Sequence, residues 1–389
     1  MVASSSKHTA DHVERDEENV VTNWAQRDAG ANDELLRSEF LALLNESATA
    51  PPDQRLIMYD ACDSGEVRAS LGDALFRKRL DARRNTKPKK PDEQKFVCTP
   101  FDPNGFNFGK IRNDRERILK LALSAGRYDL LTNKFPLFPK HMLLVAKALV
   151  PQQMTGDHLR AICELQRASG FCAYFNSWCA SASVNHFHCH LIDELPPVTA
   201  FPLVPGPLVA GVSSLTPQGF PGFCYVFSKS RAFPCVESIV RAMQEDNQPH
   251  NLLITPQFIY VFPKPHVRPA RSFELYPETV GGPELIGSFT VYSEEIFDKL
   301  QPEHVEELVR INTAPLPTRV LTPAGPVDDH CVHSSVTTDR ALSRNHVGSR
   351  TIDVLPSMPL VRSDSWLHEQ SWPQDRPIAR ALMHGNGLV

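Results

Sequence analysis

The stretch "VNHFHCHLI", residues 184–192, places a histidine at every second position: His186, His188 and His190. Successive side chains of a β-strand point to opposite faces of the sheet. The stretch therefore predicts a strand with three imidazoles on one face, while the apolar side chains between them turn into a core. Three imidazoles in one row, each about 7 Å from the next, favour a metal site or a phosphate-handling site over a purely structural strand.

Short apolar runs bounded by turns surround this stretch. Before it, strands are predicted at residues 127–132, 141–147 and 171–176, and a helix at 155–170 with Thr155 as its N-cap. After a region rich in Pro and Gly, the same types of element recur at residues 236–246 (helix), 250–255, 258–263 and 287–292 (strands) and 302–311 (helix). This order predicts an α+β fold, in which an antiparallel sheet is backed by helices.

Composition excludes some classes of function. The 389 residues carry a formal net charge of -4, which gives no reason to expect a nucleic-acid or membrane surface. No apolar run approaches the roughly 20 residues of a membrane span, and the start lacks the apolar core of a signal peptide. The nine cysteines are scattered without a CxxC pair, which favours free thiols and a cytoplasmic location.

Both ends of the chain are polar. A helix is predicted at residues 33–44, within an otherwise polar region that runs to about residue 55. The basic run "RKRLDARRNTKPKKP", residues 77–91, is predicted to be a solvated connector. From residue 315 onward the chain is rich in Pro, Ser, Thr and Asp, and it is predicted to be disordered.

The residues of the histidine strand leave two chemistries open. Imidazole is the commonest zinc ligand, but a metal site would need further ligands from Asp193, Glu194 or a distant Cys. Alternatively, one imidazole attacks phosphorus and forms a covalent phosphoimidazole, with neutral donors such as Ser183 and Asn176 on the phosphate oxygens. The motif by itself gives the metal site and the nucleophile similar weight.

Four stretches resemble one family. "SVNHFHCHLI" (183–192) looks like the histidine-triad signature, and "NKFPLFPKHMLLVAK" (133–147) resembles the turn and strand that precede the helix in that superfamily. "TPFDPNGFNFGKI" (99–111) and "QPHNLLITPQFIYVFPKP" (248–265) resemble segments of the GDP-hexose phosphorylases, relatives of the diadenosine tetraphosphate phosphorylases. The similarity covers roughly residues 95–312.

This resemblance implies a histidine-triad-like α+β fold with two similar halves. The first half carries the histidine strand, and extensions predicted to be disordered flank the two halves. The corresponding segments are 1–55 (N-terminal extension), 56–198 (first half), 199–314 (second half) and 315–389 (tail).

The resemblance also implies roles for the residues of the motif. His188 would be the nucleophile, His186 would orient it and bind phosphate, and Ser183 and Asn176 would contact the phosphate oxygens. Protonated His186 or His190 would offset the charge that develops on the phosphate. His190 departs from the pattern, because phosphorylases of this branch usually carry glutamine there and hydrolases carry histidine. The final acceptor is therefore either phosphate or water.

Three residues outside the motif are further candidates for contacts with the substrate. Asn133 either binds nucleotide or serves its turn, and Lys264 and Arg268 either bind phosphate or lie in a solvated loop. The expected reaction converts GDP-hexose and phosphate to hexose 1-phosphate and GDP through a guanylyl-histidine, without a metal or cofactor. The alternatives are phosphorolysis of diadenosine tetraphosphate, a histidine-triad hydrolase and a metal-binding protein. The expected partners are a nucleoside diphosphate sugar or dinucleoside polyphosphate and inorganic phosphate, with no nucleic acid and no membrane; a homodimer is left open.

Overall fold

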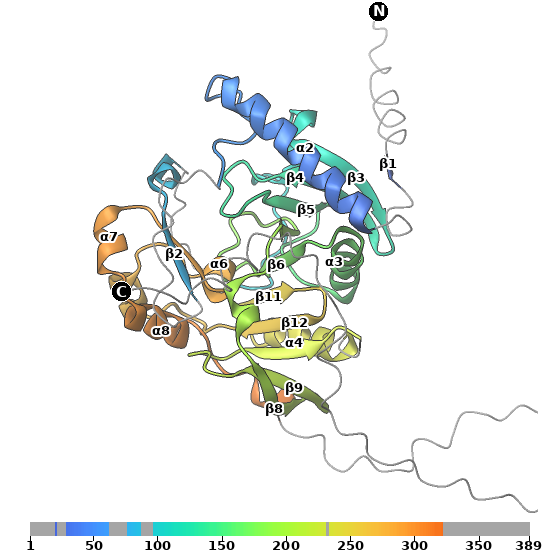
Figure 1. The fold of residues 1–389 in the computed structure, drawn as a ribbon. Coiled ribbons are helices and arrows are strands. Elements are labelled where there is room, and N and C mark those ends of the chain that lie inside the picture. Colours follow the sequence, from blue (N-terminus) through green and yellow to red (C-terminus); the bar gives the residue numbers. More distant parts are fainter. Residues whose placement is uncertain (1–19, 22–28, 62–75, 87–95, 231–232, 322–389) are drawn as a thin grey trace, which may run out of the picture. The chain divides into compact units, whose positions relative to one another are not determined.

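The computed structural model describes residues 20–21, 29–61, 76–86, 96–230 and 233–321 (Figure 1). Within the predicted tail, residues 322–389 lie outside the described residues. The last described residues are folded: α9 (Thr318–Leu321) follows Leu316, and both Leu316 and Val320 are buried.

Eleven strands of the described part form one sheet, in the order β1-β3-β4-β5-β7-β6-β11-β12-β10-β9-β8. All neighbours are antiparallel except β1 and β3. The strands are β1 (Val20–Val21), β3 (Arg117–Leu123), β4 (Gly126–Thr132), β5 (Met142–Ala146), β6 (Cys172–Asn176), β7 (His188–Ile192), β8 (Leu203–Val209), β9 (Val212–Pro217), β10 (Tyr225–Ser228), β11 (His250–Ile254) and β12 (Phe258–Pro263). A second, parallel sheet pairs β2 (Arg77–Leu80) with β13 (Ser288–Val291). The predicted α+β fold with an antiparallel sheet is confirmed.

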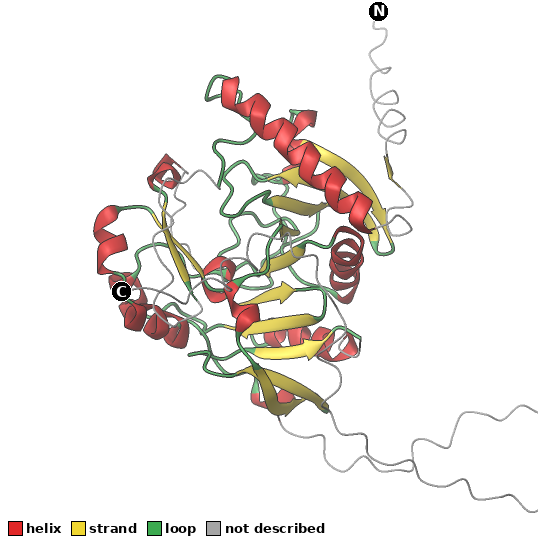
Figure 2. Ribbon diagram, in the orientation of Figure 1, coloured by secondary structure: helices red, strands yellow, loops and turns green. Residues whose placement is uncertain are grey.

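The two halves predicted from the sequence join edge to edge within this sheet. β6 of the first half pairs with β11 of the second, so that Asn176 lies opposite Asn251. A helix precedes each of these central strands: α3 (Gly156–Ser169) comes before β6, and α4 (Phe233–Glu245) before β11. The strands therefore run as one continuous layer through both halves (Figure 2).

The helices pack on the sheet and form two large hydrophobic cores with it. One core joins α2 (Ala29–Thr49), α3 and α4 to the sheet. The other core includes α6 (Gly282–Leu285), α7 (Glu294–Lys299) and α8 (Pro302–Ile311), with α5 (Ala270–Leu275) beside α8. It also contains side chains of the first half, such as Tyr174 and Ile192. Figure 1 shows β2 near α7 and α8, at the left of the view, and α3 at the right.

Residues at its two ends determine where α3 begins and ends. Thr155 caps α3, because its side chain accepts a hydrogen bond from the backbone N–H of His158. Gly170 ends this helix in a left-handed conformation, with φ of 72°, which a residue without Cβ adopts at little cost.

Two expectations for polar segments need correction. The helix predicted at residues 33–44 is longer, and it packs into the first core through Leu36 and Phe40, so the expected extension 1–55 contains a folded helix. The basic run 77–91 was expected to be a solvated connector, yet its first residues form β2, and Arg84 is only 4% exposed. Their arginines find hydrogen-bond acceptors inside the fold, and residues 87–91 lie outside the described residues.

Among the helices of the described part, none combines the length and the apolar character that a bilayer crossing needs. The described cysteines, such as Cys163 and Cys189, are free thiols.

We predict that Leu36→Ala lowers the free energy of unfolding by about 2–5 kcal/mol, because it leaves a cavity in the first core. Leu41→Ala on the same helix is the matched control: Leu41 is 43% exposed, and its loss should cost less than about 0.5 kcal/mol. Urea unfolding of both variants measures the difference, and equal costs would contradict the packing of α2.

Candidate active site

The histidine strand is shorter than predicted: β7 begins at His188, and His186 lies before it. Within β7 the side chains alternate as predicted. Cys189 of β7 is fully buried in the core on the helix-covered face. His188 lies opposite Val145 of β5, and His190 lies opposite Tyr174 of β6. The rings of Tyr174 and His190 stack at 4.3 Å with an interplanar angle of 3°. The rings of His188 and His190 lie 5.5 Å apart, so these two histidines form a pair on one face of the sheet.

The tautomer of His188 follows from a backbone contact. Its Nδ1 lies 2.8 Å from the carbonyl oxygen of His186, and a carbonyl can only accept. Nδ1 therefore carries the hydrogen, and in the neutral ring the lone pair is on Nε2. His188 is only 3% exposed. This is the tautomer that a nucleophilic Nε2 requires.

The backbone of His188 is held by Gln152, a residue that the sequence did not single out. Gln152 is fully buried; its Oε1 accepts from the N–H of His188 at 2.8 Å. Its Nε2 donates to the carbonyl oxygens of His188 and Asn176, both at 2.9 Å. One side chain thus connects the start of β7 to the end of β6 and fixes the position of the His188 backbone.

His186 supports the site from outside the strand. Its Nε2 donates to the carbonyl oxygen of Ala148 at 2.9 Å, and its Nδ1 accepts from the backbone N–H of Phe108 at 3.2 Å. Burial lowers the pKa of His186, and backbone hydrogen bonds oppose the shift only in part. The expected protonated, phosphate-binding His186 is therefore corrected to a neutral ring that holds backbone, because both of its nitrogens already have protein partners.

His190 is oriented by a second buried histidine. His141 Nδ1 accepts from the backbone N–H of Leu137 at 3.0 Å, so its hydrogen lies on Nε2. That Nε2 lies 2.9 Å from Nδ1 of His190 and donates to it. In the neutral ring of His190, the hydrogen is then on Nε2. His190 thus presents an N–H donor, as the amide of a glutamine would.

The 99–111 segment covers the same face of the sheet. The ring of Phe108 lies 5.0 Å from that of His188 and 5.8 Å from that of His186. Phe108 and Ile111 also pack on the buried side chains of β4 and β5. Phe106, 6.0 Å from Phe108, is 56% exposed at the edge of this cover. The segment therefore limits solvent access to His188.

Asn176 lies at the junction of the two halves. Its Oδ1 accepts from Nδ2 of Asn251 at 2.7 Å and from the backbone N–H of Gly282 at 3.1 Å. A Cβ at Gly282 would lie 2.5 Å from this Oδ1, so only glycine allows the approach. The amide oxygen of Asn176 is thus used to join β6, β11 and α6.

The remaining predicted residues divide into two groups. Asn133 serves its turn: its Oδ1 accepts from the N–H of Phe135, and its Nδ2 lies 3.3 Å from both ring nitrogens of His141. Ser183 lies exposed in the loop between β6 and β7, five residues before His188. Asn133 is therefore brought to the His141–His190 pair, whereas Ser183 stays a candidate by its place in the loop.

Lys264 and Arg268 are not in a solvated loop facing the substrate. Lys264 is buried and donates to the carbonyl oxygen of Val280 at 2.7 Å, and burial lowers the pKa of its ammonium group. Arg268 donates to the side chain and carbonyl of Ser272 and stacks on Phe273. Both side chains therefore contact groups of the second half, and a phosphate contact stays a prediction.

The geometry favours nucleophilic chemistry over metal binding. Among the described residues, no three His, Cys, Asp or Glu side chains are grouped in a way that suits a metal ion. His186 already uses both ring nitrogens on backbone groups. In the neutral tautomers, the lone pair of His188 is on Nε2, and the neighbouring His190 carries its hydrogen on Nε2.

Comparisons with known proteins show which family the sequence resembles. Residues 39–192 match the family model described as "GDPGP1-like, N-terminal domain". A relative from Danio rerio, named GDP-D-glucose phosphorylase 1, is 34% identical over 160 residues, which cover 40% of this chain and 46% of the relative. One of the same name from Homo sapiens is 30% identical over 256 residues, covering 60% and 65%. The matches confirm the resemblance to the GDP-hexose phosphorylases, and they span less than two thirds of either relative.

A solved structure resembles the fold. The crystal structure of yeast Ap4A phosphorylase in complex with AMP matches with a TM-score of 0.52 and 16% identity, covering 74% of this chain and 97% of that one. The likeness confirms the predicted fold class.

We predict that Gln152→Ala lowers stability by about 1–3 kcal/mol, because it leaves the buried N–H of His188 without its acceptor. Gln153→Ala is the matched control: within the described residues, the half-buried Gln153 makes no side-chain hydrogen bond. Thermal and urea unfolding of the two variants compare them. If both lose the same stability, Gln152 does not hold the strand.

Proposed function

We propose that this chain is a nucleotidyltransferase of the phosphorylase type, with GDP-hexose and inorganic phosphate as substrates. The observation that carries the proposal is the hydrogen bond from His188 Nδ1 to the carbonyl of His186, which puts the lone pair on Nε2. The sequence resemblance and the names of the relatives support GDP-glucose as the hexose nucleotide to test first.

In the first step, Nε2 of His188 attacks the α-phosphorus of GDP-hexose. The N–P bond forms while the bond from this phosphorus to the bridging oxygen breaks, and hexose 1-phosphate leaves with the electron pair. The ring becomes positively charged, and the carbonyl of His186 stabilises this charge through Nδ1–H. Covalent catalysis of this kind splits one displacement into two.

In the second step, an oxygen of inorganic phosphate attacks the same phosphorus. The N–P bond breaks, GDP leaves, and His188 regains its neutral tautomer. The Nε2–H of His190 donates to the oxygens of the α-phosphate, which gain charge in both steps. Phosphate rather than water is the proposed acceptor, because the long second half and residues 99–111 resemble the phosphorylase branch.

Diadenosine tetraphosphate is the second candidate substrate, because residues 133–147 resemble the phosphorylases of that dinucleotide and the fold resembles one of them. Cleavage at the α-phosphorus would follow the same two steps. A cytoplasmic location stays a prediction from the sequence.

We predict that brief incubation with GDP-glucose without phosphate adds one guanylyl group to the protein, measured by intact-mass spectrometry. Added phosphate should discharge it and release GDP. His188→Asn should abolish the adduct and lower kcat by at least about 1,000-fold, because the nucleophile is lost. His304→Asn, in α8, is the control and should keep both. An adduct that survives in His188→Asn would rule out His188 as the nucleophile.

We also predict that His190→Gln keeps kcat within about tenfold of the parent, because an amide N–H replaces Nε2–H. His190→Ala should lose about 100-fold or more, since removal of one preorganised donor has this effect. Separation of GDP from GMP by chromatography measures the acceptor at the same time. GMP as the main product of the parent protein in the presence of phosphate would instead support a hydrolase.

A further inference from the structure

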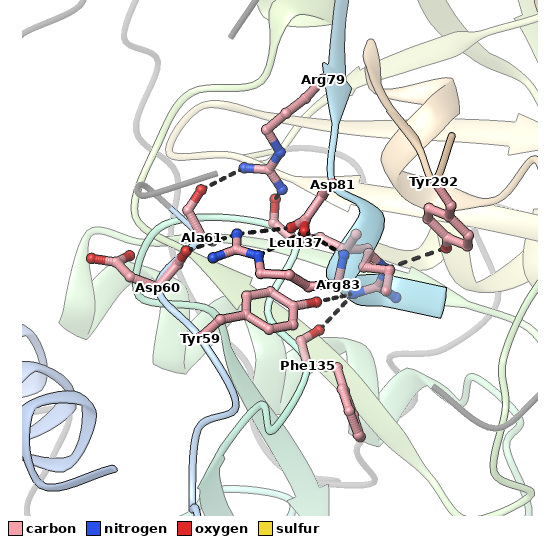
Figure 3. A network of polar contacts seen from close by, with 10 residues as sticks. Tyr59, Asp60, Ala61, Arg79, Asp81, Arg83, Phe135, Leu137 and Tyr292 are labelled. Atoms are coloured by element: carbon pink, nitrogen blue, oxygen red, sulfur yellow. Dashed lines mark hydrogen bonds and ion pairs between the residues drawn. The ribbon is translucent and has the colours of Figure 1, made fainter. Parts of the chain in front are cut away.

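A buried arginine of the basic run reaches the loop between β4 and β5. Arg84, in the turn that follows β2, donates through Nη1 to the carbonyl oxygen of Phe135 at 2.8 Å. Its guanidinium also donates to the hydroxyl groups of Tyr59 and Tyr292, both at 3.2 Å. Figure 3 shows this network, with Tyr59, Phe135 and Tyr292 among its sticks.

A second arginine of the same run binds the same loop. Arg79, on β2, donates to the carbonyl oxygens of Leu137 and Ala61 (Figure 3). The two arginines thus hold the carbonyls of Phe135 and Leu137 from outside the loop. A peptide unit is planar, so a hydrogen bond to its carbonyl fixes the orientation of the whole unit. Arg84 fixes the unit 135–136 and Arg79 fixes the unit 137–138. The unit between them carries the N–H of Leu137.

That N–H leads into the candidate active site. It donates to Nδ1 of His141, whose Nε2 donates to His190. Pro136 adds stiffness, because its ring restricts the backbone next to Leu137. The orientation of the loop thus determines which nitrogen of His141 accepts, and His141 in turn determines which nitrogen of His190 carries the hydrogen.

We propose that Arg84, assisted by Arg79, is a positioning residue that fixes the tautomer of His190 through the Phe135–Leu137 loop and His141. The role of His190 in turnover rests on the function proposed above. Arg84 is 4% exposed and acts through the loop rather than on the substrate.

The residue type supports a directional role. A guanidinium is a planar fork that can bind three acceptors at fixed angles, whereas an ammonium is a point charge on a flexible stem. The described acceptors of Arg84 are two hydroxyl groups and one carbonyl, all neutral. A buried cation is expensive to desolvate, so burial alone would favour an apolar side chain at this position. An arginine at this position is explained if the fixed geometry of its guanidinium orients the Phe135–Leu137 loop.

The first experiment is a double-mutant cycle on phosphorolysis of GDP-glucose. Arg84→Lys should lower kcat about 10- to 100-fold with little change in KM, since a small misplacement of a catalytic group costs this much. In a His141→Ala background the same change should have little further effect, because the path through His141 is already broken. In a Gln152→Ala background, Arg84→Lys should lower kcat by nearly the same factor as in the parent, because Gln152 acts on His188 and not on His141. Arg115→Lys, at an exposed ion pair with Glu46, is the control and should leave kcat unchanged.

The second experiment is independent of turnover. In full-length protein labelled with 15N-histidine, the parent should show His190 with the hydrogen on Nε2, and Arg84→Lys should show the two tautomers mixing. Thermal unfolding confirms that the variant is folded. An unchanged His190 tautomer in folded Arg84→Lys would overturn the proposal, as would full effects of Arg84→Lys in the His141→Ala background. If the parent turns over neither nucleotide while the tautomer responds, the proposed function fails and the positioning role stands.

Discussion

Neutrality of the buried imidazoles is the constraint on which this site depends. His141, His186 and His188 are buried in or beside the sheet, and burial lowers the pKa of His186. A neutral imidazole has one donor and one acceptor, and each needs a partner of the opposite kind. The fold meets this need mainly with backbone groups, such as the carbonyl of His186 and the N–H of Leu137. Because backbone groups cannot change their role, each tautomer is fixed in advance of any substrate.

The same constraint explains why three chemically equal side chains have different roles. His186 uses both nitrogens to hold Phe108 and Ala148, so it acts as structural support. His188 uses Nδ1 on a carbonyl and keeps its lone pair on Nε2. His190 receives a hydrogen bond on Nδ1 and so presents an N–H. Position in the hydrogen-bond network, rather than spacing, assigns the roles.

Much of the fold and part of the site could be predicted from the sequence. The period of two in residues 184–192 predicted a strand with Cys189 turned into the core, and Thr155 predicted the start of α3; both are confirmed. The contacts of Lys264 and Arg268 with carbonyl groups could not be predicted, because a basic segment looks alike whether it faces anions or buried carbonyls. Gln152 was missed, since no local period marks a side chain that bonds two distant strands.

The sequence by itself determined the central strands, the helix α3 and the alternation within β7, because side-chain alternation and capping depend on neighbours along the chain. Only the tertiary structure decided the tautomer of each ring and the joining of the halves at β6 and β11. It also decided that the arginines of the basic run, Arg79 and Arg84, turn inward to the loop before β5. These features depend on hydrogen bonds between residues far apart in sequence, and the direction of such bonds is fixed only when the chain has folded.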